Sequence, residues 1–418
     1  MRIQTLLNRY CPLKSFVYTM CELQTNGDDD QLIITVEPRK NGRVICSGCG
    51  SACKAYDHLE VRDFGFVPLW NISVLFRYHM RRVDCPECGV KVERVPWADG
   101  KQRTCKVFQL FLARWARKLS WKETAVSFRT SWDTVYRSVK SVVEYGLRYR
   151  SLDGIEAVGV DEIQFGKGHN YLTLLYQIDA GRRRLLLIGK GRKKSTLRNI
   201  FDELGESRVK TLKYICSDMW KNYLAVIAER APQALNILDR FHIMQHIGKA
   251  INRIRIDEKR RLKEEGYDES ILSKTKYCFL KNPENLTEKQ ALKLEDVLQY
   301  NLKSVRAHLL KESFRLFWEY KSPYWAQWYL EKWCTRAMRS RLEPMKDFVQ
   351  MIRRHQPLIM NWFKAKKQFN SGIVEGMNRK VNLVTRKSFG FRSYEVLKIA
   401  LYHTMGNLPE PESTHRFC

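Results

Sequence analysis

Three acidic residues stand where a carboxylate can do chemistry. Asp161 and Asp218 each follow an apolar, β-rich run, in GIEAVGVDEI and LKYICSDMW, and Glu375 lies in NSGIVEGMNRK, which has a helical pattern. Two carboxylates at strand ends and a third on a helix can share a pair of magnesium ions, and such a pair promotes in-line attack on a phosphodiester. The chain therefore carries the side chains that metal-dependent cutting and joining of DNA requires.

The charge of the chain points to the same substrate. Its 418 residues include 74 Lys and Arg against 45 Asp and Glu, a formal net charge of +29. A charge of this size predicts a polyanionic partner, because each neutralised phosphate releases condensed counterions. A generically basic protein is the alternative. The length suggests roughly two to four domains, each able to bury a core.

No feature of the chain indicates export or membrane insertion. The first residues, MRIQTLLNRYCPLKSF, lack the apolar stretch and cleavage site of a secretory signal. No apolar run reaches the roughly 18 residues of a membrane span. We therefore expect a cytoplasmic protein with reduced thiols, in which the 12 cysteines serve metal binding or burial rather than disulfides.

Two cysteine pairs of the same design predict a structural zinc site. Cys46-Ser-Gly-Cys49-Gly and Cys85-Pro-Glu-Cys88-Gly can supply four thiolates to one tetrahedral ion, with Cys53 as a rival fourth ligand. The 35 residues between the pairs contain strand-like runs, so we expect a zinc ribbon with an inserted hairpin. A redox motif and simple burial are the alternatives. Nearby arginines can contact DNA or form a solvated strand face: Arg77, Arg81 and Arg82.

The pattern of the segment that follows predicts a helix-turn-helix. Residues 104–117 have apolar positions at helical spacing, and Ser120 with Glu123 forms a capping-box pattern that opens a short helix. Ser131 is a second N-cap candidate, before a longer helix. The alternative to a DNA-binding helix-turn-helix is an ordinary helical hairpin. The longer helix has four side chains that we predict to face outward, toward DNA: Thr134, Arg137, Ser138 and Lys140.

A third region alternates strands and helices. Strands are predicted at 155–160, 171–179, 184–188, 211–216 and 234–238, with helices at 194–206 and 219–230. Three antiparallel strands, then helix, strand, helix and strand, is the order of the ribonuclease-H-like fold, in which the first and fourth strands are neighbours. Asp161 and Asp218 would then meet, and a divalent cation would relieve their repulsion. Considered alone, an aspartate at the end of a strand is also typical of a turn or of a cap.

Further polar residues are candidates for the same site. Asn370-Ser371 can cap a helix over 372–383, on which Glu375, Asn378, Arg379 and Asn382 share one face. Asp239 and His242, in DRFH, can pair on one helical turn and contact a phosphate or orient an acid. A solvated helix face and a structural histidine are the respective alternatives.

These motifs, in this order, resemble the bacterial insertion-sequence transposases of the ISL-three family. The shared features are the cysteine pairs, the helix-turn-helix, VDE, SDMW, DRFH and NSxxEGxNRKxxxxxRxxxGFR, and they cover nearly the whole chain. The resemblance implies a DDE triad at Asp161, Asp218 and Glu375 that uses Mg²⁺ or Mn²⁺. It also implies a Zn²⁺-binding N-terminal domain and a helix-turn-helix for terminal inverted repeats. Asp84 stands before the second cysteine pair, where a basic or aromatic residue is expected.

The resemblance also implies partners and an assembly. The partners are double-stranded DNA, as inverted repeats and as target, and further copies of the chain, since two ends must be synapsed by a dimer or larger assembly. We expect a bacterial cytoplasmic protein at the nucleoid, without a membrane partner. The rival functions are a ribonuclease-H-like nuclease that never joins DNA and a domesticated DNA-binding regulator. Basic residues near the triad are predicted to position phosphates: Arg192, Lys193, Lys194, Lys380, Arg386, Lys387 and Arg392.

The fold expected is a multidomain α+β protein. The predicted domains are a zinc ribbon (1–98), a helix-turn-helix (99–150), a ribonuclease-H-like core in two parts (151–244 and 366–418), and an all-helical insertion (245–365) that interrupts the core. The insertion holds an aromatic cluster that its periodicity assigns mainly to helix packing, with stacking on a DNA base as the alternative. The cluster comprises Trp318, Tyr324, Trp325, Trp328 and Trp333.

Overall fold

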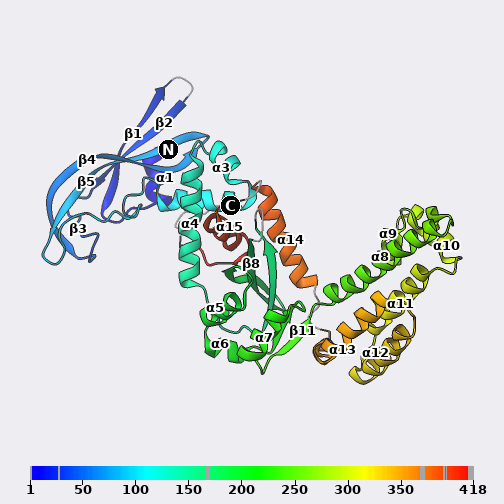
Figure 1. The fold of residues 1–418 in the computed structure, drawn as a ribbon. Helices are drawn as coiled ribbons and strands as arrows, with labels where there is room; N and C mark the ends of the chain where they lie inside the picture. The colour runs from blue at the N-terminus through cyan, green and yellow to red at the C-terminus, as the bar shows by residue number, and fades with distance from the viewer. Residues whose placement is uncertain are drawn as a thin grey trace. The chain divides into compact units, whose positions relative to one another are not determined.

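The computed structural model describes residues 2–26, 29–165, 170–367, 372–388, 391 and 393–412 (Figure 1). It is a mixed α+β protein with two mixed sheets, and its chain divides into two compact units. One unit comprises Met1–Ser151 and Val381–Cys418, and the other comprises Leu152–Lys380. Among the described helices, none is both long and apolar enough to cross a membrane.

The first unit begins with α1 (Ile3–Tyr10) and a six-stranded sheet in the order β1-β2-β5-β4-β3, with β6 paired to β5. Its strands are β1 (Phe16–Asn26), β2 (Asp29–Pro38), β3 (Val44–Ile45), β4 (Ala52–Leu69), β5 (Ile72–Cys85) and β6 (Gly89–Val92). The antiparallel β4–β5 hairpin lies between the two cysteine pairs, as predicted. Buried aromatic rings, including those of Phe64, Tyr78 and Trp97, hold the sheet together by edge-to-face contacts.

Four further helices lie wholly within the first unit: α2 (Lys106–Lys118), α3 (Trp121–Ser127), α4 (Trp132–Tyr149) and α15 (Tyr394–Met405). The capping box of Ser120 and Glu123 is confirmed, and so is the N-cap at Ser131. The prediction that Ser138 faces outward is wrong. Its side chain is buried, because it lies on the same stripe of α4 as Val135 and Val142, and its hydroxyl donates to the Thr134 carbonyl at 2.7 Å.

The second unit contains a five-stranded sheet in the order β11-β10-β7-β8-β9. Its strands are β7 (Ala157–Gln164), β8 (Tyr171–Asp179), β9 (Arg182–Lys190), β10 (Tyr214–Ser217) and β11 (Leu235–Leu238). The first three are antiparallel, while β10 lies parallel between β7 and β11. The predicted order of strands and the adjacency of the first and fourth strands are therefore confirmed.

Helices α5 (Lys194–Leu204), α6 (Glu206–Thr211) and α7 (Lys221–Arg230) connect these strands. Apolar residues of α5 and α7 pack on one face of the sheet, against side chains such as Val158 and Val160. Helix α6 was not predicted. The left-handed backbone of Gly205, with φ of 94°, ends α5 and lets the chain begin a separate short helix.

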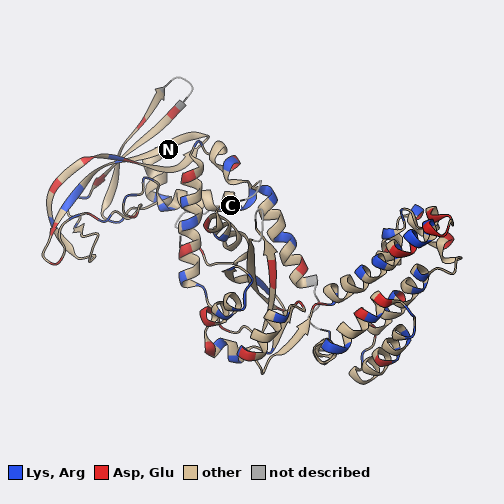
Figure 2. Cartoon of the chain, viewed as in Figure 1, with Lys and Arg blue, Asp and Glu red and all other residues tan. Residues whose placement is uncertain are grey.

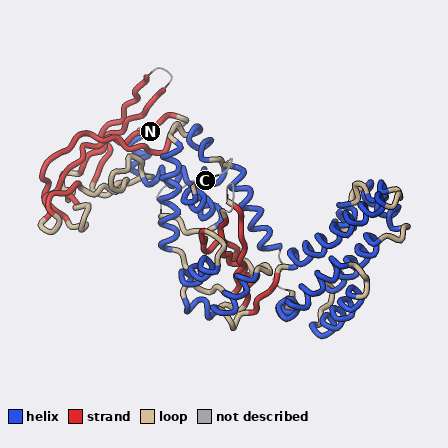
Figure 3. The backbone as a smooth tube through the Cα atoms, viewed as in Figure 1, coloured by secondary structure: helices blue, strands red, loops and turns tan. Residues whose placement is uncertain are grey.

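The segment from β11 to residue 364 is helical in all its regular structure (Figure 3). It contains α8 (Arg240–Glu264), α9 (Lys276–Leu280), α10 (Glu288–Leu298), α11 (Lys303–Phe317), α12 (Pro323–Met338) and α13 (Glu343–Lys364), with 3-10 turns at Glu269–Leu272 and Pro283–Asn285. Helix α14 (Gly372–Lys387) follows. In the aromatic cluster, Trp318 and Trp333 are buried core residues as predicted, whereas Tyr324, Trp325 and Trp328 are exposed on the surface of the protein.

Candidate functional site

Asp161 lies within β7, and Asp218 directly follows β10, the parallel strand beside it. The register pairs Cys216 of β10 with Gly159 of β7. Asp161 is two residues further along β7, and Asp218 is two residues further along the chain, just past the end of β10. Parallel neighbours run about 4.8 Å apart, so side chains at equivalent positions leave the sheet side by side. The carboxyl ends of such strands are where open α/β sheets bind ligands.

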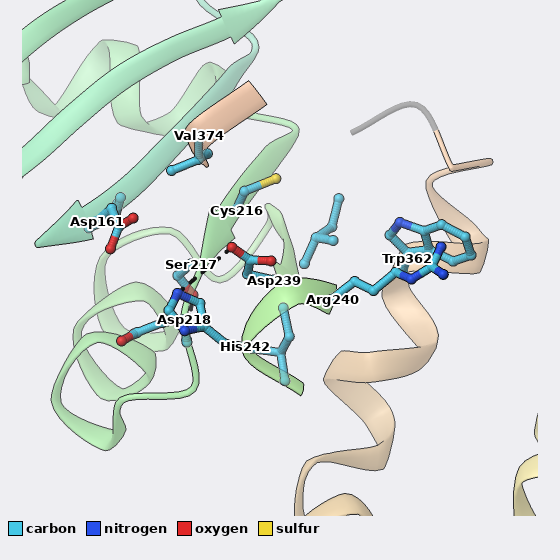
Figure 4. A pocket seen from close by; sticks show the side chains of 12 residues that line it. Asp161, Cys216, Ser217, Asp218, Asp239, Arg240, His242, Trp362 and Val374 are labelled. Atoms are coloured by element: carbon cyan, nitrogen blue, oxygen red, sulfur yellow. Dashed lines mark hydrogen bonds and ion pairs between the residues drawn. The ribbon is translucent and has the colours of Figure 1, made fainter. Parts of the chain in front are cut away.

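Asp239 extends this row to the third parallel strand. Ile237 of β11 pairs with Cys216, so Asp239 is also two residues beyond the matched position. All three aspartates line one small cavity of about 10 Å³, on the order of a single water molecule, together with His242 (Figure 4). Asp239 caps α8 by accepting the Phe241 N–H at 2.7 Å, and its other oxygen lies 3.8 Å from His242 Nε2, as the DRFH spacing predicted.

The orientation of Asp161 is fixed by hydrogen bonds. Its Oδ1 accepts the backbone N–H of Glu162 at 2.7 Å, and its Oδ2 accepts the amide N–H of Asn378 on α14. The Asn378 oxygen in turn accepts the hydroxyl of Tyr176 at 2.9 Å, and Tyr176 is fully buried. The tyrosine therefore sets which end of the amide faces the aspartate. The sequence carried no signal for Tyr176.

Burial raises the pKa of both Asp161 and Asp218, because it disfavours the charged form. For Asp161 the Glu162 N–H, Asn378 and His242 lower the pKa and Asp218 raises it, while for Asp218 the Trp220 N–H and His242 lower it. Two neighbouring carboxylates held in partly desolvated surroundings favour a hard cation, and carboxylate oxygens are the ligands that magnesium takes. The type of these ligands suits such an ion, but among the described residues Asp161, Asp218, Asp239 and His242 do not form a group whose ligand atoms all lie within 4.8 Å of one another.

Helix α14 meets the sheet at Gly159. A Cβ added at Gly159 would lie 2.7 Å from Cγ2 of Val374, so the absence of a side chain lets the helix approach β7. Val374 lines the aspartate cavity, and Asn378, one turn later, contacts Asp161. The first turn of α14 thus lies against the edge of the site.

Glu375, the predicted third acid of the triad, lies on the first turn of α14. Within the described parts of the chain, its oxygens do not form a group with those of Asp161 and Asp218 inside 4.8 Å. Because Val374 and Asn378 turn toward the sheet, Glu375 projects from another side of the helix, where it pairs with Arg379 at 2.6 Å. It lines a groove next to the site together with Arg240, which also lines the aspartate cavity.

A second pocket beside Asp218 contains residues that were not assigned to the acidic site. Glu162, Arg192 and His246 line it with Asp218 and His242. The Oε1 atom of Glu162 lies 3.5 Å from Arg192, and its Oε2 atom is buried with no hydrogen-bond partner in the described structure. Two features of the sequence could have pointed to these residues. Glu162 directly follows Asp161 in VDE, and His246 comes four residues after His242, at the spacing of one helix face.

The two cysteine pairs meet in the first unit. The Sγ atoms of Cys46, Cys49, Cys85 and Cys88 all lie within 4.8 Å of one another. Zinc–sulfur bonds of about 2.3 Å in a tetrahedron separate the sulfurs by roughly 3.8 Å, and Cys49 and Cys85 are 3.5 Å apart. The group is thus compatible with zinc. Cys53 packs beside it but is not a member.

The three arginines near the cysteine pairs are all held by acids, and Arg77 makes a two-point contact with Asp63, at 2.9 Å for each bond. Arg81 is buried and makes a two-point contact with Glu93, at 3.0 and 2.8 Å. A phosphate contact by Arg81 does not fit this geometry, because its guanidinium already donates hydrogen bonds to the Glu93 carboxylate. Arg82 is more exposed and pairs with Asp57.

The other predicted DNA contacts lie on helices or at their ends. Arg137 and Lys140 are exposed on α4 and form ion pairs within that helix, and Thr134 is partly buried. Basic side chains recur along α14 (Figure 2), among them Lys380, Arg386 and Lys387. A groove at the start of α5 is lined by Arg192, Lys193 and Lys194. Arg392 and the predicted cap, Asn370 and Ser371, lie outside the described residues.

Comparisons with known proteins agree with the motifs. A family model for ISL3 transposases, described as "Transposase", matches residues 158–401, more than half of the chain. The transposase for insertion sequence element IS1001 of Bordetella parapertussis is 27% identical, over 84% of this chain and 86% of its own. The transposase for element IS1557 of Mycobacterium tuberculosis is 28% identical, over 93% and 92%. The chain belongs to the ISL3 family of insertion-sequence transposases.

Proposed function

We propose that this transposase cuts DNA at the ends of an insertion sequence and joins the freed ends to target DNA, with Asp161, Asp218 and Glu375 as its acidic triad. The observation that carries the proposal is the parallel pairing of β7 and β10, which puts Asp161 and Asp218 each two residues beyond the matched pair Gly159 and Cys216. The strand order and the helices on the sheet support a ribonuclease-H-like core, interrupted by the helical segment that begins at α8.

Asp161 and Asp218 would hold the divalent metal, with Glu375 completing the set. A magnesium ion held by these residues would supply polarisation of the scissile phosphate and activation of the attacking oxygen. For this role Glu375 must break its ion pair with Arg379 and turn toward the aspartates. The first turn of α14 borders the aspartate cavity, because Val374 lines it. Arg379 is then released to contact a DNA phosphate.

The other residues of the site position these groups. Tyr176 and Asn378 hold the Asp161 carboxylate in one orientation, so that its free lone pairs face the cavity. Asp239 anchors the first turn of α8 and keeps His242 beside the row of aspartates, where the imidazole can donate to a phosphate oxygen. No covalent link to protein is needed, because a freed 3′-hydroxyl can attack the target phosphodiester directly.

Recognition of the element's ends is assigned to the first unit. Helix α4, with Arg137 and Lys140, would enter a major groove, and the zinc-ribbon sheet with Arg82 would contact the backbone. The four cysteines would hold Zn²⁺, and the site stabilises strands that bury little else around it. The domain boundaries given above, and a dimer or larger assembly on DNA, belong to this proposal.

The test is a joining assay in vitro. Full-length protein is incubated with Mg²⁺, a precleaved end of its own element and supercoiled plasmid. We expect covalent joining of the 3′ end to the plasmid. Hydrolysis without joining would identify a nuclease instead, and specific binding without either reaction would identify a regulator.

A further inference from the structure

A basic groove with an exposed aromatic ring begins beside Glu375. It has a volume of about 720 Å³ and is formed by α8, α9 and α11 with the first turn of α14. We call it the insertion groove. Its lining residues that enter the argument are Arg240, Phe241, Met244, Lys249, Lys276 and Glu375.

One stripe of α8 forms the floor of this groove. Phe241, Gln245, Lys249 and Asn252 recur at helical spacing along it, while the opposite stripe of α8, including Ile247, is buried. From Phe241 to Asn252 the helix rises about 16 Å, which matches roughly five nucleotide steps of stacked DNA at about 3.4 Å each. The floor is therefore long enough to follow a short strand.

The groove is continuous with the acidic site through Arg240. This arginine lines both the aspartate cavity and the insertion groove, and its guanidinium lies 5.4 Å from the Trp318 ring. Phe241 follows it and is 46% exposed, although its backbone is fixed by the N–H bond to Asp239. A solvent-facing phenyl ring next to a phosphodiester site is suited to stacking on a nucleobase.

The charge of the groove fits a polyanion. Lys249 and Lys276 are exposed on facing helices, whereas Lys311 and Arg315 are engaged by Glu312 and the Phe279 carbonyl. Glu375 is the one acid among the residues that line it in the described structure. Phosphates can therefore follow the two lysines while a base contacts Phe241 and Met244.

From this arrangement we infer that the insertion groove binds unpaired nucleotides of the DNA strand next to the scissile phosphate, with one base stacked on Phe241. The inference rests on the proposed function, because it takes the scissile phosphate to lie between the aspartates and Glu375. It assigns the helical segment a role in holding single-stranded DNA rather than duplex DNA. The exposed rings of α12 are a separate surface.

The test uses full-length protein and an octathymidylate carrying one 5-iododeoxyuridine, without divalent cation. Irradiation should cross-link the probe to a peptide containing Phe241. Phe241→Ala should weaken binding of the probe about 5- to 150-fold and abolish that cross-link, while Phe241→Trp retains both. Lys249→Ala and Lys276→Ala should each reduce the slope of log affinity against log salt by about 0.7.

Trp325→Ala, an equally exposed aromatic residue on α12, is the matched control and should leave probe binding unchanged. Cross-links that map to Trp325 or Trp328, binding that survives Phe241→Ala, or equal competition by an eight-base-pair duplex would each overturn the inference. The proposed function is judged separately, by joining with wild-type protein. If the protein joins DNA but no cross-link forms at Phe241, the inference about the groove is wrong and the proposed function stands. If Phe241 cross-links but the protein does not join DNA, the proposed transposition chemistry is wrong and the binding of single-stranded DNA in the groove stands.

Discussion

Asn378 on α14 donates a hydrogen bond to Asp161 on β7, although the two residues are 217 positions apart in the chain. The contact joins the helix that carries Glu375 to the sheet that carries the two aspartates. It supplies a physical route by which segments distant in sequence make one site, and it is held in turn by Tyr176.

The triad is tested by conservative substitution. Asp161→Asn, Asp218→Asn and Glu375→Gln keep the size of each side chain and remove its charge, so each should lower strand transfer by about 10²- to 10³-fold or more. Binding to the element's ends, measured by mobility shift, should persist. Joining at the wild-type rate in any of these variants removes that residue from the mechanism.

Asp218→Asn should also stabilise the protein in the absence of metal. The folded-state pKa of Asp218 is raised above 3.8, so its charge destabilises the fold at pH values above that raised pKa, and the cost disappears as the pH falls below 3.8. We expect a higher Tm than wild type in EDTA at pH 7.5. Added Mn²⁺ should raise the Tm of wild type and not that of the variant. The opposite order would mean that the hydrogen bond from the Trp220 N–H to the carboxylate outweighs the cost of its burial.

Gly159→Ala should displace α14. The new Cβ would lie 2.7 Å from Val374, and relief of such overlap costs about 1–3 kcal/mol. Joining activity should fall together with stability. Gly376→Ala is the control on the same helix, because no atom lies within 4 Å of its added Cβ, and it should stabilise the helix by up to about 1 kcal/mol. Equal behaviour of the two variants would contradict the role given to Gly159.

Removal of zinc should unfold part of the first unit. One equivalent of zinc is expected by elemental analysis, and Cys46→Ser or Cys88→Ser should abolish it. Proteolysis should then cut within β3 to β6. Cys53→Ser is the control, since Cys53 is not a member of the four-sulfur group, and it should keep the metal. Loss of zinc in Cys53→Ser alone would reassign the fourth ligand.

His403 should make the first unit sensitive to mild acid. Burial lowers its pKa from 6.5 to about 3, and its Nε2 has no hydrogen-bond partner in the described structure. Because the folded-state pKa is depressed, the unfolded chain binds the proton first, so stability falls as the pH drops from about 6.5 toward 3. Between pH 7.5 and 5.5 the loss is about 1.4 kcal/mol.

The measurement for His403 is the difference in Tm between these two pH values. In His403→Leu the difference should be smaller than in wild type, because the leucine has no proton to gain. An unchanged difference would show that other groups control the acid response.

The sequence predicted the parts of the site that depend on strand order. Asp161 and Asp218 were both predicted to stand at strand ends. Asp218 does follow β10 directly, whereas β7 continues past Asp161 to Gln164, and the strand order alone was enough to make the two acids neighbours. The Ser120–Glu123 and Ser131 caps were predictable because capping is local. Ser138, Arg81 and the environment of Glu375 were not, since each depends on which face of an element the tertiary packing covers. Tyr176 donates its hydrogen bond to Asn378, and a contact 202 residues away leaves no local pattern.

The most direct test of the central claim is a crystal of the protein soaked in Mn²⁺ and measured at the manganese absorption edge. The account predicts an anomalous peak bound by Asp161 and Asp218, with Glu375 turned from Arg379 toward it. A peak elsewhere on the protein, or none in crystals of protein that joins DNA with Mn²⁺, would contradict it.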